Sequence, residues 1–313
     1  MNPAPFMQLP GVDLPPAHAL WLRAADDLRL RAVLWTAPAA RGTLLLFPGR
    51  TEYCEKYDAI ARLLTARGLH VLAIDWRGQG LSDRLLDDPR PGHIGSFADY
   101  QKDVAELVRA AEALDLPQPW HLLAHSMGGA IGLAALAEGL PVVTASFSAP
   151  MWGILHGPLP RGAVTAISHL AGRVGRSGKP AIGTGGGGTY LLDEPFSGNL
   201  LTGYAPEWAR LLVEAESWPE LTIGGASWGW VAEAMSECAR LSRLPAPDLP
   251  ALISLGSDEA IVSPQAIRQR AAGWQRARLL ELDGVRHEVL MDAPRHRDQF
   301  IKAMLALIAG QPD

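Results

Sequence analysis

Residues 122–130, with the sequence Leu-Leu-Ala-His-Ser-Met-Gly-Gly-Ala, end an apolar run abruptly at a serine among small residues. This pattern is typical of a nucleophile elbow, in which a strand turns sharply into a helix and a strained backbone exposes the serine hydroxyl. The residues two before and two after the serine pack closely in such a turn, so both must be small. Ala124 and Gly128 meet this requirement, although Ala124 stands where the usual pattern has glycine. Ser126 is therefore the candidate nucleophile.

A serine hydroxyl needs a base, usually histidine, and the histidine needs a carboxylate that fixes its tautomer and stabilises its charged form. Asp258 follows the apolar run 252–255, and His287 follows a second apolar stretch at 279–282. We therefore predict Asp258 as the acid and His287 as the base. Glu259 is the competing acid and ranks below Asp258, which lies between a strand and an apolar pair.

Acyl transfer also needs N–H donors for the oxyanion that forms on the substrate carbonyl. The expected donors are the backbone N–H after the nucleophile, on Met127, and one in the loop after an earlier strand, on Arg50. Pro48 has no N–H, and Gly49 allows the backbone to approach closely. Because the donor is main chain, removal of the Arg50 side chain should cost less turnover than removal of the Ser126 hydroxyl.

Composition predicts a globular protein without a nucleic-acid partner. The 313 residues are 48% hydrophobic and 19% charged, and the net charge of -5 provides no basic surface for nucleic acid. Two cysteines without C-x-x-C spacing favour a reduced compartment. No H-E-x-x-H pattern occurs, so we expect no metal and no cofactor. Without an apolar leader or a membrane-length apolar run, we expect a cytoplasmic protein, with peripheral contact at the inner membrane face left open.

Hydrophobic patterns predict the elements that position these residues. Two alternating segments, 19–24 and 28–35, indicate an antiparallel hairpin at a sheet edge. Continuous apolar runs then alternate with helical patterns: strands are predicted over 43–47, 69–74, 120–124, 251–255 and 278–282, and helices over 55–67, 101–114, 264–272 and 294–308. This alternation predicts an α/β fold with a mostly parallel central sheet and helices on both faces.

Residues 150–239 break this alternation. They hold five of the ten tryptophans and the run 183–188, which contains five glycines. We predict an inserted, largely helical cap over the carboxyl ends of the strands, where open α/β sheets bind ligands. The core domain would then comprise 1–149 and 240–313. A surface embellishment without a catalytic role is the alternative.

Four further segments carry a family resemblance. Residues 48–57 resemble an oxyanion loop, with Pro48 where many members have histidine, and 75–82 are similar to the D-x-R-G-x-G-x-S segment. Residues 148–151 and 228–231 resemble the entry to and exit from a cap. With the elbow, the chain resembles the α/β-hydrolase superfamily across nearly its whole length, and within it the branch of bacterial lysophospholipases and monoacylglycerol lipases. The resemblance implies the α/β-hydrolase fold and hydrolysis of carboxylic esters, of lipids rather than peptides.

The leading expectation is therefore a serine hydrolase that cleaves lysophospholipid or monoacylglycerol through an acyl-enzyme on Ser126. A general carboxylesterase or thioesterase for small acyl substrates is the second candidate. A catalytically inactive binding protein of the same fold is the third, and the presence of Ser126, Asp258 and His287 argues against it.

Cap residues are candidates for substrate contact. Aromatic side chains would line an acyl pocket, and the candidates are Trp152, Trp228 and Trp230. They could equally form the cap's own core. A basic cluster could meet a phosphate headgroup or form a solvated face, and consists of Arg173, Arg176 and Lys179. Headgroup, acyl-chain length, regiochemistry and oligomeric state stay open.

Overall fold

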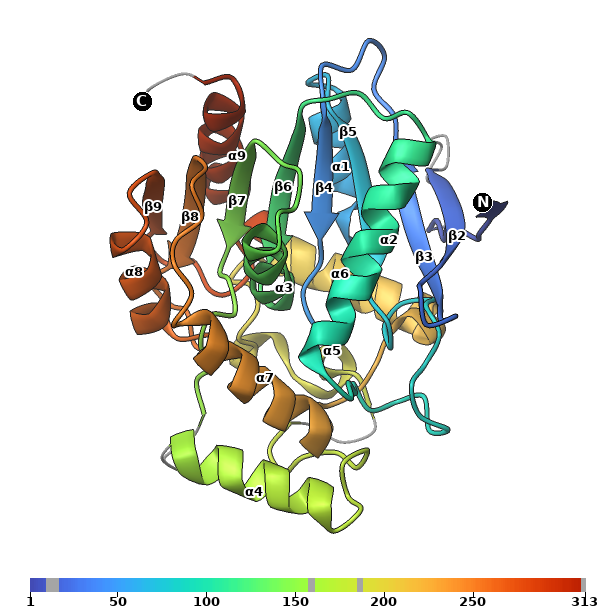
Figure 1. Ribbon diagram of the computed structural model, residues 1–313, viewed down its shortest axis with the longest axis vertical. Helices are drawn as coiled ribbons and strands as arrows, with labels where there is room; N and C mark the ends of the chain where they lie inside the picture. The colour runs from blue at the N-terminus through green and yellow to red at the C-terminus, as the bar shows by residue number, and fades with distance from the viewer. Residues whose placement is uncertain (10–16, 157–160, 185–187, 311–313) are drawn as a thin grey trace.

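A nine-stranded sheet forms the centre of the computed structural model, which describes residues 1–9, 17–156, 161–184 and 188–310 (Figure 1). The strand order is β1-β2-β3-β5-β4-β6-β7-β8-β9. The neighbouring strands β1, β2, β3 and β5 pair antiparallel. The neighbours β5, β4, β6, β7, β8 and β9 pair parallel, which confirms the mostly parallel sheet. The strands are β1 (Asn2–Pro3), β2 (His18–Arg23), β3 (Arg29–Trp35), β4 (Thr43–Phe47), β5 (His70–Asp75), β6 (Trp120–His125), β7 (Thr144–Ser148), β8 (Ala251–Gly256) and β9 (Ala277–Leu282).

Helices cover both faces of this sheet. In Figure 1, α2 (Tyr100–Ala113) and α3 (Met127–Ala137) lie in front, and α1 (Asp58–Thr65) lies behind. Alternate side chains of one strand point to opposite faces, so Leu45 joins the core under α2 and α3, while Leu44 joins the core under α1 and α9 (Pro294–Ile308). The helices α8 (Pro264–Ala272) and α9 (Pro294–Ile308) have the predicted bounds. The helix expected over 55–67 begins as a 3-10 turn, Cys54–Tyr57, before α1.

One central strand has no counterpart among the predicted strands. The sequence of β7 is Thr-Ala-Ser-Phe-Ser, yet all five residues are buried between β6 and β8. Its small polar residues interrupt the apolar run by which the other parallel strands are recognised. The predicted hairpin, in contrast, is confirmed by the antiparallel pairing of β2 with β3.

The chain between β7 and β8 forms helices at the carboxyl ends of the parallel strands (Figure 1). These are α4 (Arg161–Arg173), α5 (Tyr190–Asp193), α6 (Ala205–Ser217) and α7 (Trp228–Leu241). α7 packs against α3 of the core, and α4 packs against α7. We call this segment the cap; its predicted end at 239 falls within α7, and the division into core and cap domains stays a prediction. Residues 185–187 of the glycine-rich run lie outside the described residues.

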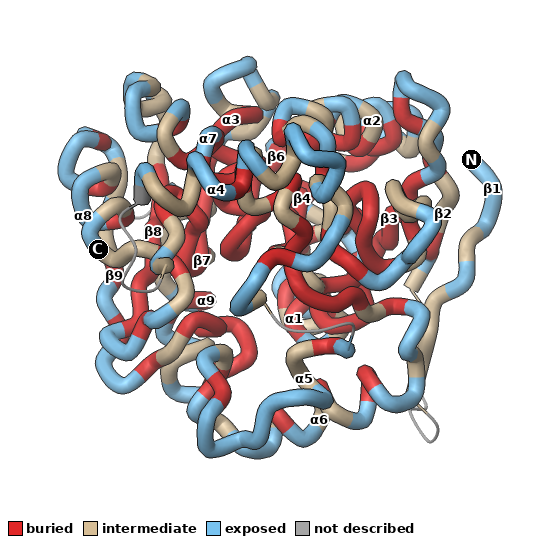
Figure 2. The backbone as a smooth tube through the Cα atoms, turned by 90° about the horizontal axis from the view of Figure 1, so that it is seen from below, coloured by how far each residue is buried: buried red, intermediate tan, exposed pale blue. Residues whose placement is uncertain are grey.

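Burial follows the layered arrangement. Figure 2 shows the buried backbone concentrated in the sheet and the inner helices, with exposed segments around the rim. Within the described ranges, no helix is long and apolar enough to cross a membrane.

Candidate active site

Ser126 occupies a strained turn between β6 and α3. Its backbone has φ 50° and ψ −117°, a conformation that non-glycine residues rarely adopt. The Ser126 N–H donates to the Ser148 carbonyl at 3.0 Å, and the Ser126 carbonyl accepts from the Met151 N–H at 2.8 Å. A Cβ on Gly128 would lie 2.1 Å from the Phe47 carbonyl oxygen, so no larger residue fits there. These contacts hold the turn that the small-residue pattern predicts.

A chain of hydrogen bonds links this serine to a histidine and a glutamate. His287 Nε2 lies 2.8 Å from Ser126 Oγ, and His287 Nδ1 lies 2.7 Å from Glu259 Oε2. Asp258 is exposed, and its carboxylate accepts from Ser257 Oγ instead. The prediction that Asp258 contacts His287 is therefore wrong, and the neighbouring residue takes that position.

The turn after β8 explains this correction. The Asp258 N–H donates to the Val285 carbonyl at 3.0 Å, which fixes the backbone with this side chain outward and the next one inward. Glu259 Oε1 accepts from the N–H groups of Ile261 and Val262 at 2.7 and 3.0 Å, which leaves Oε2 for the histidine. When two carboxylates are adjacent in a loop, the sequence carries no signal that shows which one turns toward the histidine.

Electrostatics favour an ionised glutamate beside a basic imidazole. Burial lowers the pKa of His287, but the carboxylates of Glu259, Glu288 and Glu52, Glu259 foremost, together outweigh burial and raise this pKa above its ordinary value. Burial raises the pKa of Glu259, yet His287 and the two backbone N–H groups bring it below its ordinary value. With Nδ1 donating to the carboxylate, Nε2 is the nitrogen that can accept a proton from Ser126.

The loop after β4 packs against the serine turn, since a Cβ on Gly128 would lie 2.5 Å from the Pro48 carbonyl oxygen. Among the described residues, neither the Arg50 N–H nor the Met127 N–H has a protein acceptor. The Gly49 N–H is bonded to the Glu52 carboxylate and cannot serve as a donor. Gln79 fixes the loop by donating to the Gly49 carbonyl at 3.0 Å and accepting from the Thr51 N–H at 2.9 Å. This arrangement supports Arg50 and Met127 as oxyanion donors.

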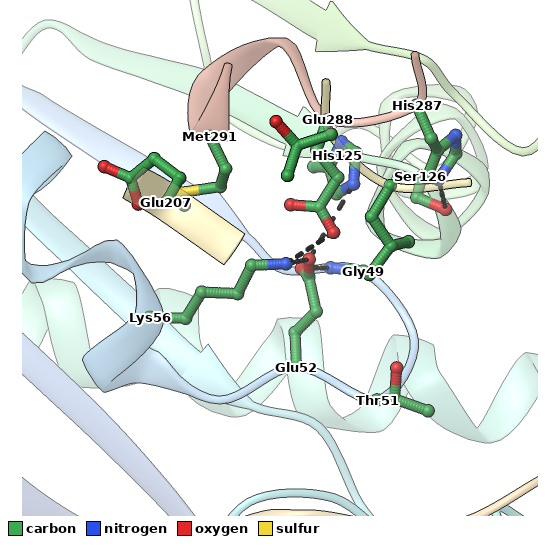
Figure 3. Close-up of polar contacts among 12 residues, drawn as sticks. Gly49, Thr51, Glu52, Lys56, His125, Ser126, Glu207, His287, Glu288 and Met291 are labelled. Atoms are coloured by element: carbon green, nitrogen blue, oxygen red, sulfur yellow. Dashed lines mark hydrogen bonds and ion pairs between the residues drawn. The ribbon is translucent and has the colours of Figure 1, made fainter. Parts of the chain in front are cut away.

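Under this loop lies a buried charged cluster that the sequence did not reveal (Figure 3). Lys56 Nζ bridges Glu52 at 2.5 Å and Glu288 at 2.6 Å, and the Tyr57 hydroxyl donates to Glu52 at 2.5 Å. Burial raises the pKa of Glu52, but Lys56 and His125 outweigh it and lower this pKa to about 2. Glu52, Lys56 and Tyr57 share one segment, but Glu288 lies 232 positions beyond Lys56, so no local pattern could indicate the complete cluster.

Part of this cluster has the residue types of a metal site. Glu52, His125 and Glu288 offer ligand atoms within 4.8 Å of one another. The Lys56 ammonium, however, bonds both carboxylates and already supplies the positive charge between them. The donor set therefore does not fit a metal ion while Lys56 is in place. Through these two ion pairs, Lys56 joins the loop after β4 to the loop that carries His287.

The cap closes over the histidine loop. The Glu288 N–H donates to the Leu201 carbonyl at 2.9 Å, and Arg286 Nη1 donates to the carbonyls of Asn199 and Thr202 at 2.9 and 3.1 Å. Ser126 is 8% exposed in this arrangement. These bonds hold the cap against the loop that carries His287, next to the buried Ser126.

The cap residues predicted to contact substrate have different surroundings. Trp152 packs against Phe147 and its Nε1 donates to the Gly129 carbonyl, so we assign it to the core. Trp230 is buried against the Arg50 side chain, whereas Trp228 is partly buried at the start of α7. The basic side chains lie exposed, at Arg173, Arg176 and Lys179.

The sheet topology and the elbow define an α/β-hydrolase fold. A family model described as serine aminopeptidase, S33, matches residues 38–294, and the chain belongs to this family. It is 32% identical to lysophospholipase L2 of Escherichia coli (strain K12) over 90% of this chain and 84% of that protein. It is 27% identical to a probable lysophospholipase L2 of Haemophilus influenzae, over 88% and 87%.

A solved structure shares the whole architecture. A soluble variant of monoglyceride lipase from Saccharomyces cerevisiae, in complex with a substrate analog, superimposes with a TM-score of 0.75. The match covers 98% of this chain and 99% of that one at 18% identity, so this likeness shows the fold alone.

Proposed function

We propose that the protein is a serine hydrolase of lipid carboxylic esters, acting on lysophospholipid or monoacylglycerol. One observation carries the proposal: the continuous hydrogen bonds from Ser126 through His287 to Glu259. The unused N–H groups of Arg50 and Met127 support it, because they provide the two donors that an oxyanion needs.

The reaction follows from these positions. Ser126 Oγ attacks the ester carbonyl carbon while His287 Nε2 takes the hydroxyl proton, and the oxyanion accepts from the Arg50 and Met127 N–H groups. Collapse expels the alcohol, which receives the proton from His287. A water molecule then gives its proton to His287 and attacks the acyl-enzyme, which releases the fatty acid and returns the proton to Ser126. Glu259 holds the imidazole and stabilises its charged form.

Similarity supports a lipid substrate. The relative named lysophospholipase L2 aligns with 90% of this chain, cap included. Trp228 and Trp230 stand at the cap exit as candidate contacts for the substrate. A general carboxylesterase or thioesterase would use the same Ser126 chemistry on smaller esters.

We also propose that the cap contacts a membrane surface peripherally. Its exposed apolar side chains include Ile167, Leu170 and Val174, which recur at helical spacing, and Ile182, which is 89% exposed. The exposed basic residues of the same segment would meet anionic lipids. A cytoplasmic location with contact at the inner membrane face fits this proposal.

Two measurements test the proposed hydrolase. A fluorophosphonate probe should label the folded protein at Ser126 and leave Ser126→Ala unlabelled; an unlabelled wild-type protein contradicts the acyl-enzyme. A substrate panel should then compare a lysophospholipid, a monoacylglycerol with the same acyl chain, a short soluble ester and an aminoacyl amide. Preference for the short ester would favour a general carboxylesterase.

A further inference from the structure

The Arg50 side chain extends from the oxyanion loop to the junction with the cap. Its Nη2 donates to the Gly224 carbonyl at 3.0 Å, and its guanidinium carbon lies 5.0 Å from the Trp230 ring centroid. A Cβ built on Gly92 would lie 3.3 Å from Nη2, so this glycine packs directly against the guanidinium. The cation is thus held between the core and the cap exit.

This cation has no anionic partner among the described residues. Its Nε is buried without a hydrogen bond, and burial lowers the pKa of Arg50 to about 10. The fully buried cations Arg31 and Lys56 have carboxylate partners. Arg84 is partly buried like Arg50 and donates to two backbone carbonyls, so the buried Nε without an acceptor is what distinguishes Arg50. A buried charge without a counter-charge is costly, so the position favours a ligand that supplies one.

We infer that the Arg50 guanidinium binds the phosphodiester of the substrate headgroup, which makes lysophospholipid the preferred substrate class. This inference rests on the proposed ester hydrolysis at Ser126. The backbone N–H of the same residue is the proposed donor to the ester carbonyl. In a lysophospholipid a three-carbon glycerol separates ester from phosphate, a span comparable to an arginine side chain. Arginine forms strong charge-assisted hydrogen bonds with phosphate oxygens.

The test compares two substrates that differ in the headgroup phosphate. Wild-type protein, Arg50→Met and Arg50→Lys are assayed on a 1-acyl lysophospholipid and on a monoacylglycerol with the same acyl chain. In Arg50→Met, the ratio of kcat/KM for lysophospholipid over monoacylglycerol should fall about 10- to 100-fold, because a charge-assisted hydrogen bond is lost. Most of this fall should be in KM, and Arg50→Lys should restore part of the ratio.

A matched variant and a covalent probe distinguish headgroup binding from a purely structural role of the Arg50 side chain. Arg84→Met removes another partly buried arginine that donates only to backbone carbonyls, one of them Glu220 of the cap, and should keep the wild-type ratio. An unchanged ratio in Arg50→Met, or equal loss on both substrates, overturns the headgroup role and leaves a bracing role for the side chain. Failure of the wild-type protein to react with a neutral fluorophosphonate contradicts the proposed hydrolase instead.

Discussion

At the residue scale, the choice between two adjacent carboxylates decides the chemistry of the histidine. Glu259 is buried, bonded to two backbone N–H groups and 2.7 Å from His287, whereas Asp258 is exposed. Only the glutamate can fix the imidazole tautomer. The two residues therefore form a matched pair for a direct test.

Glu259→Gln should lower kcat roughly 10⁴-fold, because the neutral amide no longer stabilises the charged histidine. Asp258→Asn should stay within about twofold of wild type, as exposed substitutions usually do. Steady-state turnover of a short ester measures both. Equal activity of the two variants would contradict the role of Glu259, and a larger loss in Asp258→Asn would indicate Asp258 as the acid.

The pH profile of Glu259→Gln gives a second test of the interaction between Glu259 and His287. Because His287 must be neutral to act as base, kcat/KM should rise with pH through the pKa of His287. Glu259 raises this pKa above its ordinary value of about 6.5, so the acid limb of wild type should lie above that value. Glu259→Gln removes the largest of the contributions that raise this pKa, so the limb should move to lower pH. A limb that does not move contradicts this assignment.

At the element scale, one lysine joins the two loops that must meet at the serine. Lys56 lies in the 3-10 turn before α1 and bridges Glu52 of the oxyanion loop and Glu288, next to His287. Both ion pairs are almost fully buried. Removing the Lys56 ammonium would leave two buried carboxylates next to each other without the positive charge that now neutralises them.

Lys56→Met should therefore lower the free energy of unfolding by about 3 to 5 kcal/mol, measured by denaturant titration. Lys102→Met is the control, because its pairs with Asp26 and Asp99 are solvent-exposed and should contribute less than about 1 kcal/mol. A similar small change in both variants would show that the buried bridge contributes little to folding.

At the scale of the whole molecule, the cap surface carries exposed apolar side chains. Leu170 is 60% exposed and Val174 is 64% exposed, although both are apolar. On the core, Val143 is 51% exposed between α3 and β7 and serves for comparison. A membrane surface would cover the cap residues and not Val143.

Val174→Asp should weaken binding to anionic phospholipid vesicles about tenfold, because it removes apolar contact and adds repulsion. Val143→Asp introduces the same change on the core and should bind like wild type. Vesicle sedimentation measures both, and turnover of a soluble ester checks that each variant is folded. Equal binding by the two variants would rule out the cap as the contact surface.

Local sequence predicted the fold and the candidate nucleophile of this protein. Apolar runs alternate with helical patterns, and Pro264 and Pro294 mark the first residues of α8 and α9, since proline is well suited to the first helical position. Small residues around Ser126 indicate the elbow because close backbone contact excludes larger ones. The pattern missed β7, whose burial comes from its neighbours and not from its composition.

Only the tertiary structure decided which side chains meet. The pairing of the Asp258 N–H with the Val285 carbonyl turns Glu259 inward, and Lys56 pairs with Glu288, which lies 232 positions further along the chain. Within the described part of the chain, packing surrounds the Arg50 guanidinium with the Gly224 carbonyl and the Trp230 ring of the cap exit and with no carboxylate. Periodicity along the chain fixes which face a residue occupies within its element, whereas long-range packing fixes what faces it.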